Sequence, residues 1–229
     1  MFRAKNLEQA RDRQLIENRV AHITHRAKDK KVLDIGVVEH FSESASVSSW
    51  LHQHVAKAAR SCLGIDILAT EVGQLRERGF NVQLHDITES PLEQKFELII
   101  VGDVVEHLNN PSALFMNTSA MLEKNGRLLI STPNPWYANA ILKNVFEGLP
   151  FTDSADHVAW FDAGTLSELA SRNGLILTHY SGVRAEKSGS LKSALFLKMA
   201  SLLIMVGIRP EVFAKTMIYE FALPPDHRD

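Results

Sequence analysis

The sequence is poor in the features that mark several protein classes. It has one cysteine, Cys62, so no intramolecular disulfide can form, and it has no Cys/His cluster with zinc-finger spacing. Glycine (12) and proline (8) are too few for a fibrous or low-complexity chain of 229 residues. Lysine and arginine total 25 against 27 for aspartate and glutamate, so no charge excess favours nucleic acid. We therefore expect a globular protein with a small-molecule partner, no DNA partner and RNA disfavoured.

No apolar run is long enough to cross a bilayer. The longest run, 194–208, has 15 positions and is interrupted by Lys198, whereas a spanning helix needs about 20 apolar residues. The first residues turn polar before a stretch of signal-peptide length can form. We therefore expect a cytoplasmic protein. Three interpretations of the 194–208 helix stay open: core packing, a cap or homodimer face, and contact with a membrane surface.

Short apolar runs alternate with helical stretches along most of the chain. The runs predict strands at 32–36, 63–67, 82–86, 98–103 and 127–131. Strands that are apolar on both faces and separated by helices favour a parallel sheet with both faces covered. In the last third, the pattern predicts a helix at 162–172, a strand at 175–180, the apolar helix and a strand at 216–223.

The domain organisation follows from length and charge. Residues 1–30 are predicted to form an N-terminal helical extension, and 31–229 one α/β domain with 133–161 and 184–214 as acceptor-side or cap inserts. Residues 1–31 have nine Lys/Arg against four Asp/Glu, and Ile16, Val20 and Ile23 recur at helical spacing. This pattern predicts one basic amphipathic helix packed on the domain, with an RNA- or lipid-binding arm as the alternative.

Acidic residues stand at the ends of four successive predicted strands, namely Asp34, Asp66, Asp86 and Asp103, and Glu106 and His107 follow the last of these. Ligands of an open parallel sheet bind outside the carboxyl ends of its strands. A phosphate cradle needs several glycines and a cation, whereas residues 36–40 contain only Gly36 and an acid. The acidic rim therefore favours a ligand with hydroxyl and amino donors or a positive charge, and it disfavours a nicotinamide or ATP site.

The segments VLDIG (32–36), GIDI (64–67), VGDVVEHL (101–108), GRLLI (126–130) and TPN (132–134), together with Asp86, occur in a fixed order. In this order and spacing they resemble the motifs of class I S-adenosylmethionine (SAM)-dependent methyltransferases. The resemblance covers roughly residues 31 to 183. It implies a Rossmann-like three-layer α/β sandwich with a mostly parallel seven-stranded sheet whose last strand is antiparallel.

The resemblance also implies SAM as the cofactor and a set of residues that bind it: Asp34, Gly36, Asp66, Ile67, Asp86, Ile87, Asp103 and Val104. In the family, the equivalent of Gly36 lets the backbone approach the methionine part, and the equivalent of Asp66 accepts from the ribose hydroxyls. Asp86 and Ile87 would frame the adenine, and Asp103 and Val104 would line the methionine end. The later glycines of the family's Gly-x-Gly-x-Gly loop are replaced here by Val38 and by Glu39-His40. We expect 41–49 to form a flap or an altered cofactor contact.

Methyl transfer to a hydroxyl group is helped by a base, and histidine is the natural candidate near neutral pH. His157 is predicted to be the substrate-side base or acceptor ligand, and His107 is the second catalytic candidate. The alternative for His157 is a structural histidine packed beside Trp160. The acidic residues at 153–162 lack a metal-ligand pattern, so no metal is expected.

The predicted function is that of a SAM-dependent methyltransferase acting on a small-molecule or glycan acceptor, at oxygen. Segments 50–52 and 106–108 further resemble a bacterial branch associated with surface-glycan biosynthesis. Four aromatic residues are expected either to line the acceptor pocket or to pack under a loop: Trp136, Tyr137, Phe146 and Phe151. The alternatives are a degenerate non-catalytic SAM-binding or interaction module, a nicotinamide oxidoreductase and an RNA methyltransferase.

Overall fold

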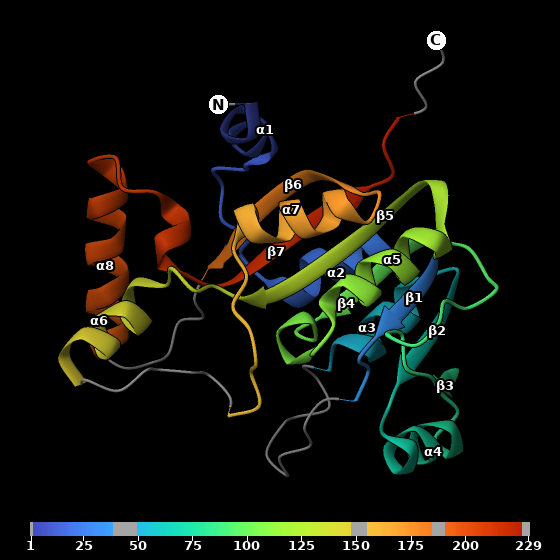
Figure 1. Ribbon diagram of the computed structural model, residues 1–229. Helices are drawn as coiled ribbons and strands as arrows, with labels where there is room; N and C mark the ends of the chain where they lie inside the picture. The colour runs from blue at the N-terminus through green and yellow to red at the C-terminus, as the bar shows by residue number, and fades with distance from the viewer. Residues whose placement is uncertain (1, 39–49, 148–154, 185–190, 226–229) are drawn as a thin grey trace.

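The computed structural model describes residues 2–38, 50–147, 155–184 and 191–225 (Figure 1). The helices are α1 (Phe2–Ala10), α2 (Arg19–Ala27), α3 (Leu51–Ala58), α4 (Ala69–Glu77), α5 (Pro111–Met121), α6 (Ala138–Glu147), α7 (Ala163–Arg172) and α8 (Leu191–Met205), with 3-10 turns η2 (Val105–His107) and η3 (Pro210–Phe213). The strands are β1 (Lys31–Ile35), β2 (Ser61–Asp66), β3 (Val82–Leu84), β4 (Phe96–Gly102), β5 (Leu122–Pro133), β6 (Ile176–Arg184) and β7 (Ala214–Ala222).

Seven strands form one sheet in the order β3-β2-β1-β4-β5-β7-β6. Strands β1 to β5 pair in parallel, whereas β7 is antiparallel to both β5 and β6. The predicted mostly parallel seven-stranded sheet with an antiparallel last strand is therefore confirmed. The strand order reverses between β1 and β4, which is the place where open α/β sheets bind their ligands.

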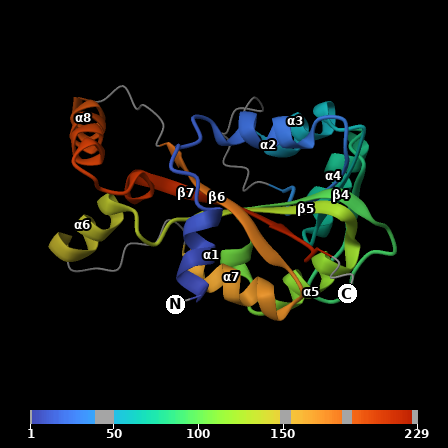
Figure 2. The same cartoon turned by 90° about the horizontal axis from the view of Figure 1, so that it is seen from above.

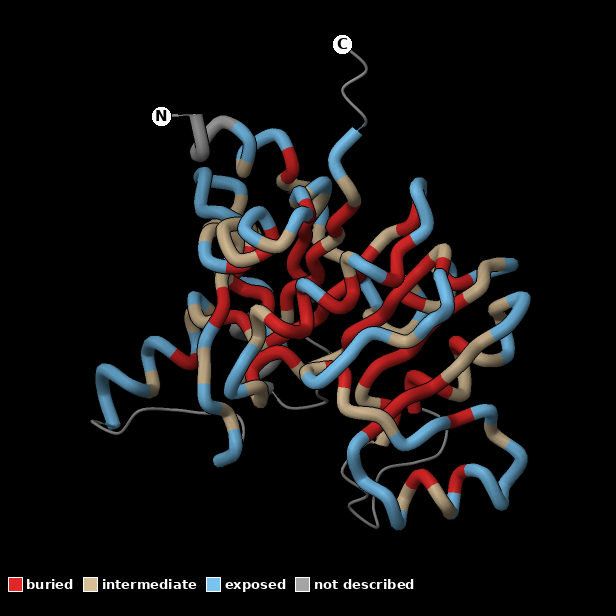
Figure 3. Tube along the Cα trace, turned by 45° about the vertical axis from the view of Figure 1, so that its right-hand side comes forward, coloured by how far each residue is buried: buried red, intermediate tan, exposed pale blue. Residues whose placement is uncertain are grey.

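Helices cover both faces of the sheet, which explains why the central strands are apolar on both sides. Figure 2 shows α2, α3 and α4 on one side of the sheet and α1, α5 and α7 on the other. Along β1, Val32 packs in a cluster with Ile23 of α2, while Leu33 packs in a cluster with Phe115 of α5. This alternation follows the two-residue period of a strand. Buried positions therefore follow the strands in the chain trace (Figure 3).

The N-terminal segment forms two helices, so the prediction of a single amphipathic helix was wrong. Asn18 caps the start of α2, because its side chain accepts a 2.8 Å hydrogen bond from the backbone N–H of Ala21. Between the two helices the chain pairs with β6. The backbone N–H of Ile16 donates to the carbonyl of Gly182 at 2.9 Å, and that of Arg184 donates to the carbonyl of Ile16 at 2.8 Å. Ile16 is therefore an extended residue on the edge of the sheet.

Helices α6 and α8 project past the end of the sheet where β5 and β6 terminate (Figures 1 and 2). Helix α6 follows β5, α8 follows β6, and both contact the η3 turn that leads into β7. Within the described ranges, no helix has both the length and the apolar character that a bilayer span requires. The two helices thus extend from the edge of the sheet at which the parallel strands present their carboxyl ends.

Candidate active site

A cleft of about 780 Å³ opens at the carboxyl ends of the parallel strands. The described residues that line it include all those predicted from the sequence to bind the cofactor or to act in catalysis: Asp34, Gly36, Asp66, Ile67, Asp86, Ile87, Asp103, Val104, His107 and His157. They converge because parallel strands end at the same edge of a sheet. The hydrogen bonds and ion pairs of each residue show which side chains are engaged within the protein and which retain capacity for a ligand.

Gly36 ends the first strand in a conformation and a space that exclude a side chain. Its φ angle is +77°, in the left-handed region that favours glycine. A Cβ atom at this position would lie 2.2 Å from Cγ2 of Val104, which is closer than any real contact. The turn therefore brings the backbone of β1 directly against Val104, the second residue after β4, while the predicted approach to the cofactor stays a prediction.

The loop after Gly36 lacks further glycines and is held instead by two side chains. The Asp66 carboxylate is largely buried and accepts hydrogen bonds from the backbone N–H groups of Val38 at 2.9 Å and Leu68 at 3.1 Å. The indole N–H of Trp50 donates to the carbonyl of Val37 at 2.8 Å. A carboxylate has about four acceptor positions, so Asp66 retains capacity for ribose hydroxyls. The predicted flap at 41–49 lies outside the described residues.

Two other predicted cofactor residues are engaged within the protein. The Asp34 carboxylate is buried and lies 2.8 Å from Nδ1 of buried His52, so it joins β1 to α3 beneath the cleft. The Asp86 carboxylate accepts hydrogen bonds from the backbone and the hydroxyl of Thr88 at 2.8 and 2.7 Å. Asp86 therefore shapes the turn after β3, and the buried Ile87 next to it forms part of the cleft wall.

At the end of β4, a cation and an anion lie side by side in the cleft wall. Nη2 of Arg19 lies 2.9 Å from Oδ2 of Asp103, and the Arg19 guanidinium also donates to the Ser131 hydroxyl at 2.9 and 3.1 Å. That hydroxyl donates in turn to Oδ1 of Asp103 at 3.0 Å. Asp103 has a φ of +55°, a strained value for a residue other than glycine that these contacts support. This part of the cleft wall therefore offers one positive and one negative group.

Sequence reasoning missed Arg19. The only signal in the sequence is Asn18, a residue type that favours the position immediately before a helix. Nothing in the order of residues indicates that this helix would place its first side chain against Ser131, which is 112 positions away in the chain.

Glu106 is a buried carboxylate at the cleft wall, with 1% of its surface exposed. Its Oε2 accepts a hydrogen bond from the Thr132 hydroxyl at 3.0 Å, while Oε1 has no hydrogen-bond partner among the described residues. Burial raises the pKa of Glu106 to about 7, and the hydrogen bond from Thr132 opposes the shift only in part. Sequence analysis placed Glu106 in a motif but assigned it no role at the site.

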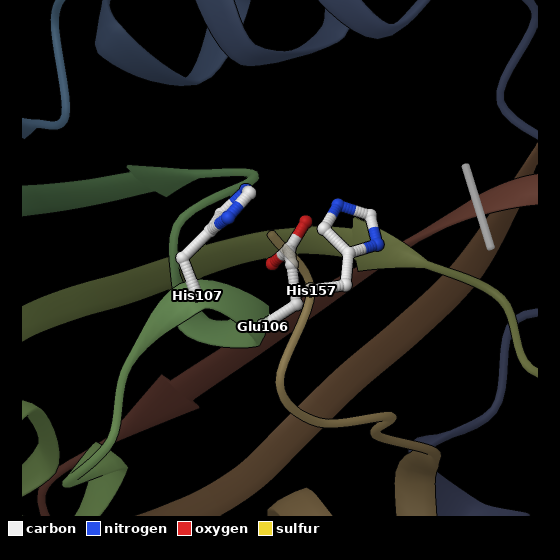
Figure 4. A group of neighbouring side chains, drawn as sticks. All are labelled: Glu106, His107 and His157. Atoms are coloured by element: carbon white, nitrogen blue, oxygen red, sulfur yellow. The ribbon is translucent and has the colours of Figure 1, made fainter. Parts of the chain in front are cut away.

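Glu106, His107 and His157 form a compact group (Figure 4). The rings of His107 and His157 meet edge to face with centroids 4.7 Å apart, and the Glu106 carboxyl group points toward the space between them. Nδ1 of His107 lies 3.1 Å from the Asp156 carboxylate. The backbone carbonyl of Glu106 accepts a 2.9 Å hydrogen bond from the N–H of Val158, which fixes the segment that carries His157.

This group can exchange protons and could also hold a divalent cation. Its nitrogen and oxygen ligand atoms all lie within 4.8 Å of one another, and imidazole and carboxylate groups suit transition-metal ions. The other acidic residues considered in this stretch are arranged differently: Asp162 caps α7 by accepting from the backbone N–H of Thr165 at 2.8 Å. Asp153 lies outside the described residues.

Of the two arrangements expected for the aromatic group, a wall of the cleft is not formed by its described members. The structure exposes Trp136 and Phe146, and neither they nor Tyr137 belong to the described cleft lining. The reason is a turn at Asn134, whose side-chain amide donates to the carbonyls of Glu211 and Ala214, each at 2.8 Å, and so leads the chain outward. Phe151 lies outside the described residues. The ring centroids of His157 and Trp160 lie 6.3 Å apart in an edge-to-face arrangement, and His157 also lines the cleft. Packing beside Trp160 and a place in the cleft are therefore compatible.

Comparison with known proteins gives a consistent result. Residues 7–180 match the family model described as a methyltransferase domain. The ubiquinone biosynthesis O-methyltransferase of Coxiella burnetii (strain Dugway 5J108-111) is 24% identical over an alignment of 168 residues that covers 68% of each chain. That of Histophilus somni (strain 2336) is 27% identical over 181 residues, covering 67% of this chain and 72% of the relative.

Solved structures share the fold at low sequence identity. The magnesium protoporphyrin IX methyltransferase of Synechocystis PCC 6803 with bound SAH aligns with a TM-score of 0.59 and 15% identity, over 90% of this chain and 82% of that one. The CcbJ methyltransferase of Streptomyces caelestis aligns with a TM-score of 0.60 and 12% identity, over 90% and 93% of the two chains.

The sheet order and the acidic cleft at its topological switch point define a class I SAM-dependent methyltransferase. The chain belongs to the methyltransferase-domain family, whose model spans most of its length. Its cofactor is SAM, and the residues of the cleft fit that molecule, because they supply an acidic partner for ribose hydroxyls and paired charges for an amino acid.

Proposed function

We propose that the protein transfers the methyl group of SAM to a hydroxyl oxygen of a small-molecule acceptor, with His157 as the base. The observation that carries this proposal is the group of Glu106, His107 and His157 in the same cleft as the cofactor residues. The curated relatives, which are named O-methyltransferases of ubiquinone biosynthesis, support oxygen as the acceptor atom. A glycan hydroxyl is the second acceptor class.

Each end of the cofactor has a complementary part of the cleft. Arg19 would bind the carboxylate of SAM and Asp103 its ammonium group, since both are charged and lie together in the wall. Asp66 would accept from the ribose hydroxyls, and Ile87 would contact the adenine. The loop after Gly36 lacks the later glycines whose backbone N–H groups would attract the carboxylate of SAM. The Arg19 guanidinium would supply that attraction instead.

When bound, SAM supplies a methyl group that its sulfonium centre already activates. The chain's own contribution is to hold the acceptor in line and to take up one proton. The methyl group would leave sulfur for the acceptor oxygen, with the S–CH₃ electron pair remaining on sulfur so that S-adenosylhomocysteine is the leaving group. The acceptor O–H bond would break, and its proton would pass to the His157 ring. Histidine suits this role because its ordinary pKa of about 6.5 lies near neutrality. Glu106, whose burial raises its pKa to about 7, lies next to the ring and can share the proton.

The test is a methyl-transfer assay with methyl-labelled SAM and a panel of phenols, catechols and sugar alcohols, with products identified by mass spectrometry. Replacing His157 with Ala or Gln should lower kcat by roughly 10²- to 10⁴-fold and leave the Kd for SAM unchanged. His179→Gln is the matched control, because His179 lies on β6 outside the described cleft lining.

The outcomes separate the alternatives. Transfer to nitrogen or carbon would overturn the choice of acceptor atom, and a protein that binds SAM but methylates nothing in the panel or in a cell extract would be a non-catalytic module. Activity that is lost in EDTA and restored by a divalent ion would assign Glu106, His107 and His157 to a metal instead of to proton transfer.

A further inference from the structure

Helices α6 and α8 expose large apolar side chains to solvent. Phe146 is 80% exposed and Met205 is 83% exposed. We use the term apolar face for the exposed group on and beside these helices: Trp136, Leu142, Val145, Phe146, Leu202, Met205, Val206 and Ile208. A group of large apolar side chains exposed on neighbouring elements marks a place of interaction.

The sequence of α8 shows that the exposure is not confined to one stripe. A surface helix that packs on a domain has a polar side for water, but in Leu191–Met205 the only charged residues are Lys192 and Lys198. Ala200 is buried while Leu202, Met205 and Val206 are exposed. Among the described side chains of α8, at 198–205, large apolar residues are therefore exposed beside Lys198 and Ser201, and they would be stabilised by an apolar environment other than this chain.

Cations outnumber acids around α8, where Glu186 precedes the helix and Glu211, which follows it, is paired with Arg11. The 24 residues from 187 to 210 contain Lys187, Lys192, Lys198 and Arg209 and no Asp or Glu, in a chain whose net charge is −2. Helix α6 adds Lys143 and one acid, Glu147. An apolar surface with cations around it complements the surface of an anionic lipid bilayer, where apolar side chains enter the boundary region and cations contact the headgroups.

We propose that α6 and α8 form a docking surface for an anionic membrane. With 15 residues, α8 is shorter than the roughly 20 that a spanning helix needs, so it would lie in the interface instead of crossing the bilayer. A second copy of the chain fits less well, because a two-fold interface would bring together two surfaces that both carry an excess of cations.

The position of the surface adds a consequence for catalysis, which rests on the proposed function. Pro133 lines the cleft and leads into α6, while Lys215 and Thr216 line the cleft shortly after α8. Docking through the two helices would therefore bring the acceptor side of the cleft next to the bilayer. The acceptor class that suits this arrangement is a hydroxyl compound dissolved in lipid.

The test is cosedimentation of the full chain with vesicles of phosphatidylcholine alone or mixed with phosphatidylglycerol. We expect binding to the anionic vesicles, weakened by high salt and by the double change Lys198→Gln with Arg209→Gln. Phe146→Ser and Met205→Ser should each weaken partitioning by about 10-fold. Met116→Ser is the matched control, because Met116 is an exposed methionine on α5, and it should bind like the unchanged protein.

Light scattering without lipid shows whether a second copy of the chain, instead of a membrane, covers the apolar face. A dimer that Met205→Ser dissociates, with no vesicle binding, would overturn the proposal in favour of a homodimer face. Failure of vesicle binding in a protein that still binds SAM and methylates a hydroxyl would overturn the membrane surface alone. Vesicle binding in a protein that methylates no hydroxyl would overturn the proposed function alone.

Discussion

Glu106 is a carboxyl group that is almost fully removed from water. One oxygen accepts a hydrogen bond from Thr132, and the other has no described hydrogen-bond partner. The carboxyl group as a whole points toward the space between the two histidine rings (Figure 4). Burial disfavours the charged form, so the pKa rises from 4.5 to about 7. Near neutral pH, both the protonated and the ionised form of Glu106 are therefore accessible. A group in this state can both accept and return a proton, which suits a site that removes one from its substrate.

The raised pKa of Glu106 predicts a pH dependence of stability. Because the folded-state pKa lies above the unfolded value, the stabilising contribution is complete below the unfolded pKa and is lost as the pH rises through about 7. Relative to Glu106→Gln, the unchanged protein should lose about 3 kcal/mol of unfolding free energy between pH values of about 4 and 8.

Urea denaturation of both proteins across this pH range measures the loss. Glu123→Gln, which changes an exposed glutamate on β5, should show no such trend. A difference between the unchanged protein and Glu106→Gln that stays constant with pH would contradict the account of a buried, neutralised carboxyl group.

At the scale of the element, α2 joins an edge strand to the cofactor cleft. The chain before it pairs with β6, Asn18 caps its start, and Ile23 and Ala27 pack against β1 and β4. These contacts fix the first helical residue, Arg19, beside Asp103. An element that lies ahead of the sheet in the sequence thus supplies one wall of the cleft.

This placement predicts a selective effect of Arg19→Gln on ligand binding. The Kd for SAM should rise by about 10- to 100-fold, because a charge-assisted hydrogen bond to its carboxylate is lost. The Kd for 5′-methylthioadenosine, which lacks the amino-acid part, should stay unchanged. Isothermal titration with both ligands measures the difference.

Arg26→Gln provides the control on the same helix, since Arg26 pairs with Glu220 away from the described cleft lining. It should bind both ligands like the unchanged protein. An equal loss of affinity for both ligands in Arg19→Gln would assign Arg19 a merely structural role.

For the whole molecule, the sheet and the floor of the site could be predicted from the sequence. Asp34, Asp66 and Asp103 follow strand patterns, and the carboxyl ends of parallel strands must meet at one edge. The rest depends on contacts between distant segments. Arg19 reaches the cleft only because α2 packs across the sheet, and the turn at Asn134 decides that Trp136 does not line the described cleft, which the sequence left open.

The hydrogen-bond partners of the residues in the cleft walls could not be predicted from the sequence either. An acid at a strand end can face a ligand or support the fold, and its partner decides between the two. The Asp34 carboxylate is paired with His52, whereas the Asp66 carboxylate accepts a hydrogen bond from the loop at Val38. Both residues nevertheless come at the end of an apolar run that predicts a strand. In the same way, the pattern of residues 1–31 could not show that Ile16 pairs with β6 instead of continuing a helix.

The central claim is that this cleft binds SAM through Asp66 in spite of the altered loop. Isothermal titration of the unchanged protein with SAM and with S-adenosylhomocysteine tests it most directly, with Asp66→Ala and the milder Asp66→Asn as variants and circular dichroism as a check of folding. We predict saturable one-to-one binding of both ligands and an affinity at least about 10-fold lower in Asp66→Ala. A folded, unchanged protein that gives neither heat nor a thermal shift with either ligand would contradict the account.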